Sequence, residues 1–364
     1  MRLESIDITQ FKNYSSAKVS FNKKVNLIYG DNGSGKTNFL DAIHFLCVSK
    51  SYFGMSDKNL VQQGESFYRL IGNFSKRSKS ETLSYKYAIG GRRTIQRNLE
   101  KIKRVSDLIG HFPVVLIAPD DINIVKGASK NRRDYFNKWI CQSDSEYLDQ
   151  LLVYNRLMRQ KDALLKGDRS PSPLAIEAFN AKLMPLAESL NQKLNTVLKP
   201  FTVELYRQYE LISSGKDRIS LSYISDFNHQ DAASLFERSL SDEVRYKRPL
   251  VGIQKDDFEF KISDYPLKKY GSQGQIKSVL YSLRLAEYNY LFDVIEDKPI
   301  LILDDYFEKL DHHRLSSLLN LLSKDQIGQV FLSDTELERS RAIFNERNIE
   351  FDSFKVTGEG IQAD

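Results

Sequence analysis

An eight-residue run, Gly30-Asp31-Asn32-Gly33-Ser34-Gly35-Lys36-Thr37, constrains this chain more than any other feature of its sequence. The run fits the pattern Gly-x-x-x-x-Gly-Lys-Thr in full. The short apolar segment before it, residues 25–29, is typical of a strand, whereas Phe39 and Ile43 after it recur at helical spacing. The pattern therefore predicts a strand, a glycine-rich turn and a helix in direct succession.

Each part of this turn has a task in a nucleotide site. Glycines let backbone N–H groups point inward at phosphate oxygens, and the following helix adds the positive end of its dipole. Lys36 can reach the β- and γ-phosphates of ATP, and the Thr37 hydroxyl can bind Mg²⁺. A glycine-rich turn that carries Lys-Thr by chance is the alternative, but it does not explain the strand–turn–helix context. The run predicts ATP binding by residues 30–37.

A second motif lies at residues 300–303, where the apolar run Ile-Leu-Ile-Leu is followed by Asp304 and Asp305. A continuously apolar run is expected of a parallel strand covered on both faces. Two carboxylates at the end of a buried strand are costly unless a cation is near. In this Walker B arrangement Asp304 would hold Mg²⁺ through water, and Asp305 would orient or deprotonate the attacking water. We therefore predict catalytic roles for Lys36, Asp304 and Asp305, although a strand that exits to solvent at two acids is the alternative.

Residues 270–275, Tyr-Gly-Ser-Gln-Gly-Gln, precede an amphipathic helix and resemble the ABC signature, whose usual form is Ser-Gly-Gly-Gln. Gln273 replaces the first glycine of that form. Small residues at a helix start form an anion site, which here would use Ser272, Gly274 and Gln275. In ABC proteins this site grips the γ-phosphate of ATP held by the other subunit. Since one head cannot close its own signature over its own phosphate turn, the chain is predicted to form an ATP-dependent homodimer.

The order of the motifs supports the ABC interpretation over an ordinary serine-capped helix, because the signature is followed by a helix and then by Walker B. Leu310-Asp311, after Glu308-Lys309, resembles the D-loop, and His312-His313 behind it is interpreted as a solvated helix start. Residues 329–334 resemble the strand that leads to the switch position. Ser333 or Asp334 stands there in place of the histidine of many transporters. No glutamine is assigned to a Q-loop.

The remaining segments follow two periodicities. Residues 1–30 and 66–118 alternate as strands do, whereas residues 145–245 carry helical stripes that Pro185 should bend or interrupt. We predict an α/β fold, an ABC-type P-loop ATPase head with an inserted, mostly helical lobe. The predicted parts are the N-terminal part of the head, the insertion and the C-terminal part of the head, at residues 1–120, 121–250 and 251–364.

Composition limits the compartment and the partners. The two cysteines, Cys47 and Cys141, are far apart and argue against a disulfide framework or a zinc knuckle. The charged N-terminus has no apolar signal core, and no apolar stretch approaches the length of about 18 residues that a membrane span needs. A net charge of +5 is compatible with a polyanionic partner. We expect a cytoplasmic protein without a membrane span.

Several blocks, in one order over nearly the full length, resemble the RecF family. Residues 11–14, Phe-Lys-Asn-Tyr, are similar to the Phe-Arg-Asn-Tyr of that family and its SMC relatives. Residues 118–133 carry its Ala-Pro-Asp-Asp, Val-Lys-Gly and Arg-Arg blocks, and residues 155–165 resemble a helix that follows them. Residues 252–257 resemble its Gly-Pro-His-basic-Asp-Asp block, with Ile253 and Gln254 in place of Pro-His.

The resemblance implies an ATP-dependent DNA-binding protein of replication and recombinational repair that hydrolyses ATP slowly. It implies binding of single-stranded, gapped or duplex DNA, assistance in recombinase loading and the SOS response, and partners similar to RecO and RecR. It also implies an ABC head with an inserted helical lobe. The interval between Lys36 and Gly271 has no sustained heptad run, so a long coiled-coil arm of the SMC kind is not expected.

Two basic clusters are candidate contacts for DNA phosphates. Such clusters suit non-specific, salt-dependent binding, but a solvated charged face is an equal alternative for either one. The first cluster has only Glu100 as an acid and contains Arg92, Arg93, Arg97, Lys101, Lys103 and Arg104. The second has only Asp134 as an acid and contains Lys126, Lys130, Arg132, Arg133 and Lys138.

Other functions of a P-loop chain remain open at this point. A small-molecule kinase would need an acceptor pocket and no signature segment at residues 270–275. An ATP-binding subunit of another ABC-type system, a transporter or an SMC-like assembly, would need a coupling surface for its partner. A structural switch would bind ATP with negligible turnover.

Overall fold

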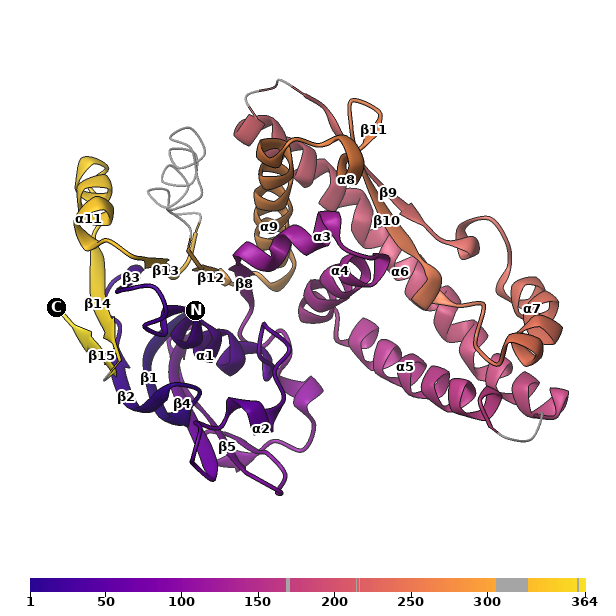
Figure 1. Cartoon of the computed structure of the whole chain (residues 1–364), viewed down its shortest axis with the longest axis horizontal. Coiled ribbons are helices and arrows are strands. Elements are labelled where there is room, and N and C mark those ends of the chain that lie inside the picture. Colours follow the sequence, from indigo (N-terminus) through magenta and orange to yellow (C-terminus); the bar gives the residue numbers. More distant parts are fainter. Residues whose placement is uncertain (168–170, 214, 216, 306–326, 359) are drawn as a thin grey trace. The chain divides into compact units, whose positions relative to one another are not determined.

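The computed structural model describes residues 1–167, 171–213, 215, 217–305, 327–358 and 360–364, and the chain divides into two compact units (Figure 1). Unit 1 comprises Met1–Asp121 and Glu287–Asp364, and unit 2 comprises Ile122–Ala286. The first boundary lies beside the expected residue 120, but the second lies at 286 rather than at 250. The reason is strand pairing, because β10 (Asp257–Ile262) pairs with β9 (Ile219–Ile224) and so belongs to unit 2.

The first sheet of unit 1 is antiparallel, with the strand order β2-β1-β4-β5-β6-β7. Alternate residues of its longer strands are buried, as their sequence pattern predicts. This confirms the strands predicted within residues 1–30 and 66–118. Its strands are β1 (Arg2–Phe11), β2 (Tyr14–Ser20), β4 (Phe67–Lys76), β5 (Lys79–Ala88), β6 (Thr94–Arg97) and β7 (Glu100–Lys101).

The second sheet of unit 1 has the order β15-β14-β3-β13-β12-β8, and its strands are parallel except for β15. β12 lies between β13 and β8 with every residue buried, which confirms the predicted central strand. The carboxyl ends of β3, β13, β12 and β8 meet at one edge, where open parallel sheets bind ligands. The strands are β3 (Val25–Tyr29), β8 (Val114–Ile117), β12 (Ile300–Leu303), β13 (Val330–Asp334), β14 (Phe351–Thr357) and β15 (Gly360–Ala363).

The core of unit 1 forms around α1 (Lys36–Val48), which contacts strands of both sheets. Phe39 and Phe45 are buried on this helix and pack edge-to-face against Phe21 and Tyr85. Each such burial contributes about 1.5–3 kcal/mol, so the helix start is held firmly in place. The shorter helices of this unit are α2 (Asp57–Leu60), η1 (Val105–Leu108), η2 (Pro119–Asp121) and α11 (Leu337–Glu346).

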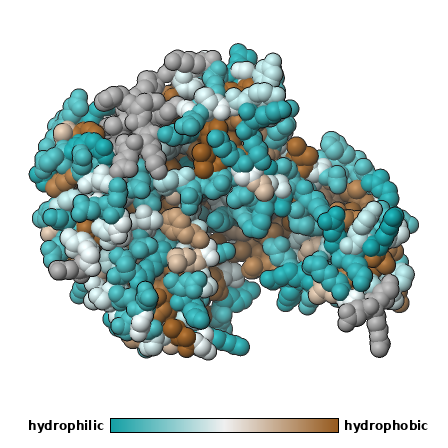
Figure 2. Space-filling model, viewed as in Figure 1, coloured by the Kyte–Doolittle hydropathy of each residue, from teal (hydrophilic) through white to brown (hydrophobic). Residues whose placement is uncertain are grey.

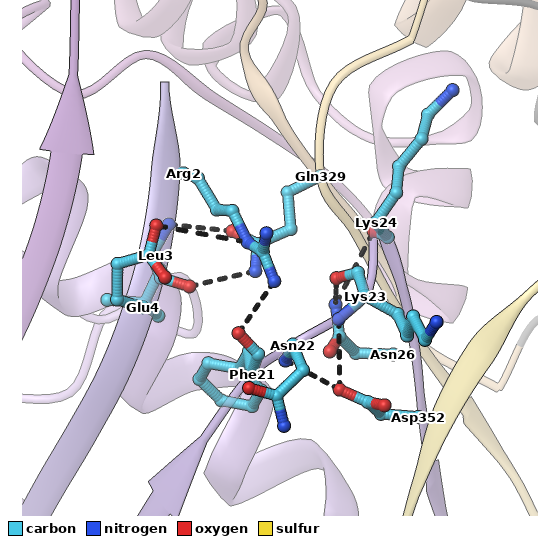
Figure 3. Close-up of polar contacts among 10 residues, drawn as sticks. All are labelled: Arg2, Leu3, Glu4, Phe21, Asn22, Lys23, Lys24, Asn26, Gln329 and Asp352. Carbon is cyan, nitrogen blue, oxygen red and sulfur yellow. Dashed lines mark hydrogen bonds and ion pairs between the residues drawn. The ribbon is translucent and has the colours of Figure 1, made fainter. Parts of the chain in front are cut away.

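Polar side chains fix the strands of unit 1 at the junction of its two sheets (Figure 3). The Gln329 amide, just before β13, accepts from the Leu3 N–H at 2.7 Å and donates to the Leu3 carbonyl at 2.8 Å. The Asp352 carboxylate on β14 accepts from the N–H groups of Asn22 and Lys23, which lead into β3. The two Gln329 bonds satisfy backbone groups of Leu3 that would otherwise be buried without partners.

Unit 2 is mostly helical, as predicted for residues 145–245, but the prediction is wrong at β9, which interrupts the helices. The expected break at Pro185 is also absent, because α6 (Pro173–Ser213) continues through Pro185 and Pro200. A proline removes one backbone hydrogen bond, and the buried face of this long helix compensates for that loss. The other helices are α3 (Ile122–Lys126), α4 (Ser129–Ser143), α5 (Ser145–Leu165), α7 (Ala232–Tyr246), α8 (Leu267–Tyr270) and α9 (Gln273–Ile295), whose last part belongs to unit 1.

The helices of unit 2 pack on each other and on a small sheet of order β11-β10-β9, in which β11 spans Tyr265–Pro266. Phe136 on α4 stacks on Phe258 of β10, and Trp139 stacks on Phe201 of α6. A fully buried ion pair joins α5 to α7, with Lys161 Nζ 2.6 Å from Glu243 Oε2. Two 3-10 turns, η3 (Asp226–Asn228) and η4 (Ile253–Lys255), precede and follow α7 in the chain.

The molecular face in Figure 2 is largely hydrophilic, with apolar residues in scattered patches. Among the helices that the structure describes, none is both long enough and apolar enough to cross a lipid bilayer.

Candidate nucleotide-binding site

The glycine-rich turn follows β3 at the carboxyl edge of the parallel sheet and ends at the start of α1. Gly30 and Gly35 have φ values of +151° and +115°, which side chains rarely adopt. A Cβ on Gly30 would lie 2.3 Å from the Val356 carbonyl oxygen, and one on Gly35 would lie 2.2 Å from Asn13 Nδ2. The turn therefore requires glycine at both positions.

Lys36 lies inside this turn and is only 5% exposed. Its ammonium group donates to the carbonyl oxygens of Gly30 at 2.8 Å and Asp31 at 3.0 Å. Asp31, Asn32 and Gly33 are exposed. The lysine charge is thus held beneath the loop, within reach of an anion that the loop would bind.

Thr37 and Asp304, far apart in sequence, are brought together at the sheet edge. The Thr37 hydroxyl lies 3.0 Å from Asp304 Oδ1 and 2.9 Å from Oδ2. Asp304 follows β12, and its N–H donates to the Ile117 carbonyl at the end of β8. Burial raises the pKa of the Asp304 carboxyl, which the Ser333 hydroxyl bond partly offsets. A hydroxyl and a desolvated carboxylate are hard oxygen donors, so these residues fit Mg²⁺.

Ser333 and Asp334, the two candidates for the switch position, have different partners. The Ser333 hydroxyl donates to Asp304 Oδ1 at 2.9 Å and accepts from the Asp305 N–H at 2.7 Å. Asp334 instead contacts Arg339 and Ser340 of α11. The end of β13 therefore couples to the Walker B carboxylate through Ser333. Sequence reasoning left this choice open because neighbouring strand residues face opposite sides.

The Phe-Lys-Asn-Tyr segment supports the turn from the antiparallel sheet. Asn13 Nδ2 donates to the Ser34 carbonyl at 3.2 Å, and the Tyr14 hydroxyl donates to the Gly35 carbonyl at 3.0 Å. Asn38 on α1 donates to Asn13 Oδ1 at 2.8 Å. In the sequence this segment indicated only a family resemblance. The structure shows that Asn13 and Tyr14 hold backbone carbonyls of the glycine-rich turn.

The Ala-Pro-Asp-Asp block forms the turn after β8, next to the Walker B strand. Asp121 accepts from the Ala118 N–H and from the Tyr52 hydroxyl. Tyr52 follows α1, and its N–H donates to Asp41 of that helix at 2.7 Å. Asp41 also pairs with Lys12 at 2.6 Å. A chain of polar contacts thus connects this turn to the phosphate-loop helix.

The signature segment lies in unit 2 at the start of α9, and it forms a capping box. The Gln275 N–H donates to the Ser272 hydroxyl at 3.2 Å, and the Ser272 N–H donates to Gln275 Oε1 at 2.9 Å. Ser272 is exposed and Gly274 is half-buried. Gln275 Nε2 also donates to the Asp217 carboxylate at 2.9 Å, which places a negative charge at the positive end of this helix. Sequence reasoning missed Asp217 because it lies far from the motif.

The first basic cluster divides by environment. Arg93 pairs with Asp57 at 3.0 Å and covers the Phe45 ring, and Arg104 pairs with Asp107. Arg97 approaches Glu81 only at 3.9 Å. The three basic residues that have no carboxylate partner among the described residues are exposed: Arg92, Lys101 and Lys103.

The second basic cluster contains residues that hold unit 2 together. Arg132 is buried and forms two bonds to the Asp257 carboxylate, at 2.7 and 3.0 Å. Arg133 donates to the Asp256 carbonyl at 2.7 Å, and Lys130 pairs with Asp134. The expectation of phosphate contacts is therefore corrected for Arg132, whose guanidinium is already satisfied inside the unit.

The D-loop at Leu310-Asp311, the preceding Glu308-Lys309 and the pair His312-His313 lie outside the residues that the structure describes.

Comparison with known proteins gives the same family from sequence and from structure. The model of the RecF/RecN/SMC N-terminal domain matches residues 2–340. The DNA replication and repair protein RecF of Cytophaga hutchinsonii is 32% identical, over 98% of this chain and 95% of its own length. The RecF protein of Flavobacterium johnsoniae is 33% identical, over 94% and 96% of the two chains.

Solved structures agree with this assignment. A structure described as the recombination mediator protein RecF-ATP in the RecFOR pathway is 27% identical, covers 100% of this chain and 97% of its own, and has a TM-score of 0.88. An Smc head domain of Pyrococcus furiosus, at 15% identity and a TM-score of 0.57, shares the fold. The predicted α/β head with a helical insertion is thus confirmed. This chain belongs to the RecF family of DNA replication and repair proteins.

Proposed function

We propose that this protein acts in DNA replication and recombinational repair, and that two copies close on DNA when both bind Mg²⁺ and ATP. The observation that carries the proposal is the meeting of Thr37, Asp304 and Ser333 beside a preformed glycine turn. The family, and a relative described with ATP, support the choice of nucleotide. Work on DNA would place the protein in the cytoplasm.

Each residue of the site has a role in this proposal. Backbone N–H groups of residues 30–37 bind the phosphates, and Lys36 turns from the loop carbonyls to the phosphate charge. Thr37 and Asp304 would hold Mg²⁺, which would supply charge neutralisation at the phosphates. Asp305 orients the attacking water, and Ser333 fixes the Asp304 carboxylate. Lys36 must give up its bonds to the loop carbonyls, and Thr37 its bond to Asp304, before they can bind the phosphates and the metal. This requirement is consistent with slow hydrolysis.

The second half of each site would come from the other copy. The first turn of α9, with Ser272, Gly274 and Gln275, presents N–H groups and the positive end of a helix dipole. A C2 dimer would use this surface twice, so ATP would be shared between the two copies. Closure would then depend on the triphosphate, and hydrolysis would reopen the dimer and release DNA.

The wider setting is also part of the proposal. A relative is described as a recombination mediator in the RecFOR pathway. We extend that setting to this chain, with proteins similar to RecO and RecR as partners and with recombinase loading at gapped DNA and the SOS response as outcomes. DNA contact is proposed to be non-specific and to weaken with salt.

The test is DNA retention and solution mass, measured with ATP, with ADP and without nucleotide. We expect a dimer and retained DNA only with ATP. Ser272→Arg should abolish both while leaving ATP binding intact, and Ser241→Arg, an exposed change on α7, should behave as the wild type. Equal retention in all three conditions would refute the proposal. Phosphate transfer that survives Ser272→Arg would favour a kinase.

A further inference from the structure

A leucine occupies the tip of the β6–β7 hairpin, where a leucine is disfavoured. Arg97 and Glu100 pair across the hairpin, so Asn98 and Leu99 form a two-residue turn. Their φ values are +51° and +71°. Such turns favour Asn-Gly, because a leucine Cβ at positive φ approaches the following carbonyl oxygen. Residues held in this way often mark functional sites.

The turn is held rigidly, so Leu99 is presented rather than mobile. Asn98 exchanges two bonds with Thr82 of β5, because its N–H donates to the Thr82 carbonyl and its Oδ1 accepts from the Thr82 N–H, both at 2.8 Å. Gln96 donates to the Leu99 carbonyl at 3.4 Å. Leu99 is 87% exposed, more than any other large apolar side chain among the described residues. Among the residues of unit 1 that the structure describes, none therefore accounts for an apolar residue at this position.

The surroundings of the tip favour a polyanion. Lys101 pairs with Gln96 across the hairpin, and Lys103 follows it in an exposed position. Arg97 precedes the turn, with only a distant carboxylate. Glu100 is the single acid of the hairpin itself. Cations on both sides of an exposed apolar tip match the pattern of proteins that insert an apolar side chain between DNA bases.

We propose that Leu99 is a wedge that enters a base step of DNA at the edge of a single-strand gap, with Arg97 and Lys101 on the flanking phosphates. The inference rests on the proposed DNA binding. A base step at a gap edge has lost one stacked neighbour, so it opens at a lower cost than an internal step. Burial of the Leu99 side chain between bases would offset the free-energy cost of its exposure and of its strained backbone in the free protein.

The experiment uses the full-length protein, ATP and a gapped duplex with 2-aminopurine at the last base pair before the gap. Unstacking of this base raises its fluorescence. We expect a rise with the wild type that is lost in Leu99→Gly and Leu99→Ala, while DNA retention at low salt changes by less than about threefold, since phosphate contacts dominate affinity. Leu174→Ala, another exposed leucine, serves as the matched control.

Stability separates a wedge from a structural role. Glycine relieves the positive φ, so Leu99→Gly should unfold at the same temperature as the wild type or higher. Lys101→Gln should weaken retention and lower the salt slope by about one phosphate contact. An equal fluorescence rise in Leu99→Gly would overturn the wedge. A Leu99→Gly protein that keeps the fluorescence rise and loses only the binding of a partner protein would overturn it as well. Wild-type retention without any fluorescence change would sink the wedge alone, whereas no retention in any nucleotide state would sink the proposed function.

Discussion

The buried ion pair between Lys161 and Glu243 gives a prediction that can be worked out from the structure. Both side chains are 0% exposed, and the ammonium group lies 2.6 Å from Glu243 Oε2. Lys161 also donates to Asn180 at 2.7 Å, and Glu243 Oε1 accepts from the Leu250 N–H at 2.8 Å. The pair therefore ties α5, α6, α7 and the segment after α7 together. Each of the two buried charges is compensated by the other.

Glu243→Gln keeps the shape and the bond to Leu250 but leaves Lys161 as a buried, uncompensated charge. Breaking a buried pair in this way lowers the free energy of unfolding by about 3–5 kcal/mol. We expect a decrease near the lower end of this range, because Asn180 and the Phe236 ring still contact the Lys161 ammonium group. The double variant Lys161→Met/Glu243→Leu should recover most of that loss, because neither charge then needs a partner.

The single tryptophan makes the measurement specific to unit 2. Trp139 is fully buried on α4, so its fluorescence during urea denaturation follows this unit. Burial lowers the pKa of Lys161 below its usual alkaline value, so in the alkaline range the unfolded chain binds more protons than the native state. The contribution of this group to the free energy of unfolding therefore rises with pH in that range. The decrease in the free energy of unfolding caused by Glu243→Gln should become smaller at alkaline pH, because Lys161 becomes neutral there. A loss below about 0.5 kcal/mol, within the range of an ordinary surface change, would refute the reasoning.

Three further predictions concern the site and unit 2. Ser333→Ala removes a charge-assisted bond to Asp304, of about 1.5–3 kcal/mol, so the Mg²⁺ concentration needed for binding of a fluorescent ATP analogue should rise by about ten- to a hundredfold. Asp217→Asn keeps a hydrogen-bond acceptor but removes a negative charge from the start of α9, so ATP-dependent dimerisation, measured by sedimentation, should tighten by about two- to fivefold per site. Burial raises the pKa of Asp256 from 3.8 to about 7, so the native state keeps a proton that the unfolded chain loses. The free energy of unfolding should therefore fall as the pH rises towards 7 in the wild type, but not in Asp256→Asn.

Matched variants control these three experiments. Ser282→Ala removes a buried hydroxyl on α9 that bonds within its own helix, and its Mg²⁺ requirement should stay at the wild-type value. Asp264→Asn removes an exposed charge from the β10–β11 turn and should leave dimerisation unchanged. Weaker dimers in Asp217→Asn would show that Asp217 positions Gln275 rather than opposing an incoming phosphate. A pH profile of Asp256→Asn that follows the wild type would assign the titration to another group.

Local patterns predicted the parts of this protein that local chemistry controls. The glycine turn could be located because phosphate binding needs glycines, a lysine and a hydroxyl at fixed spacing along one strand–turn–helix. β12 could be predicted as a central strand because a run buried on both faces must be continuously apolar. Interruptions were harder to predict. β9 lies inside a helical region, and Pro185 is accommodated by packing along α6 that a single proline does not reveal.

The sequence by itself determined that this chain carries a phosphate turn, a Walker B strand and a signature helix, because each depends on neighbours in the chain. Only the tertiary structure decided that Ser333 rather than Asp334 meets Asp304, that Arg132 is committed to Asp257, and that Asp217 reaches the signature helix. These contacts join residues far apart in the chain. Strand order and helix packing bring such residues together, and no periodicity along one segment encodes them.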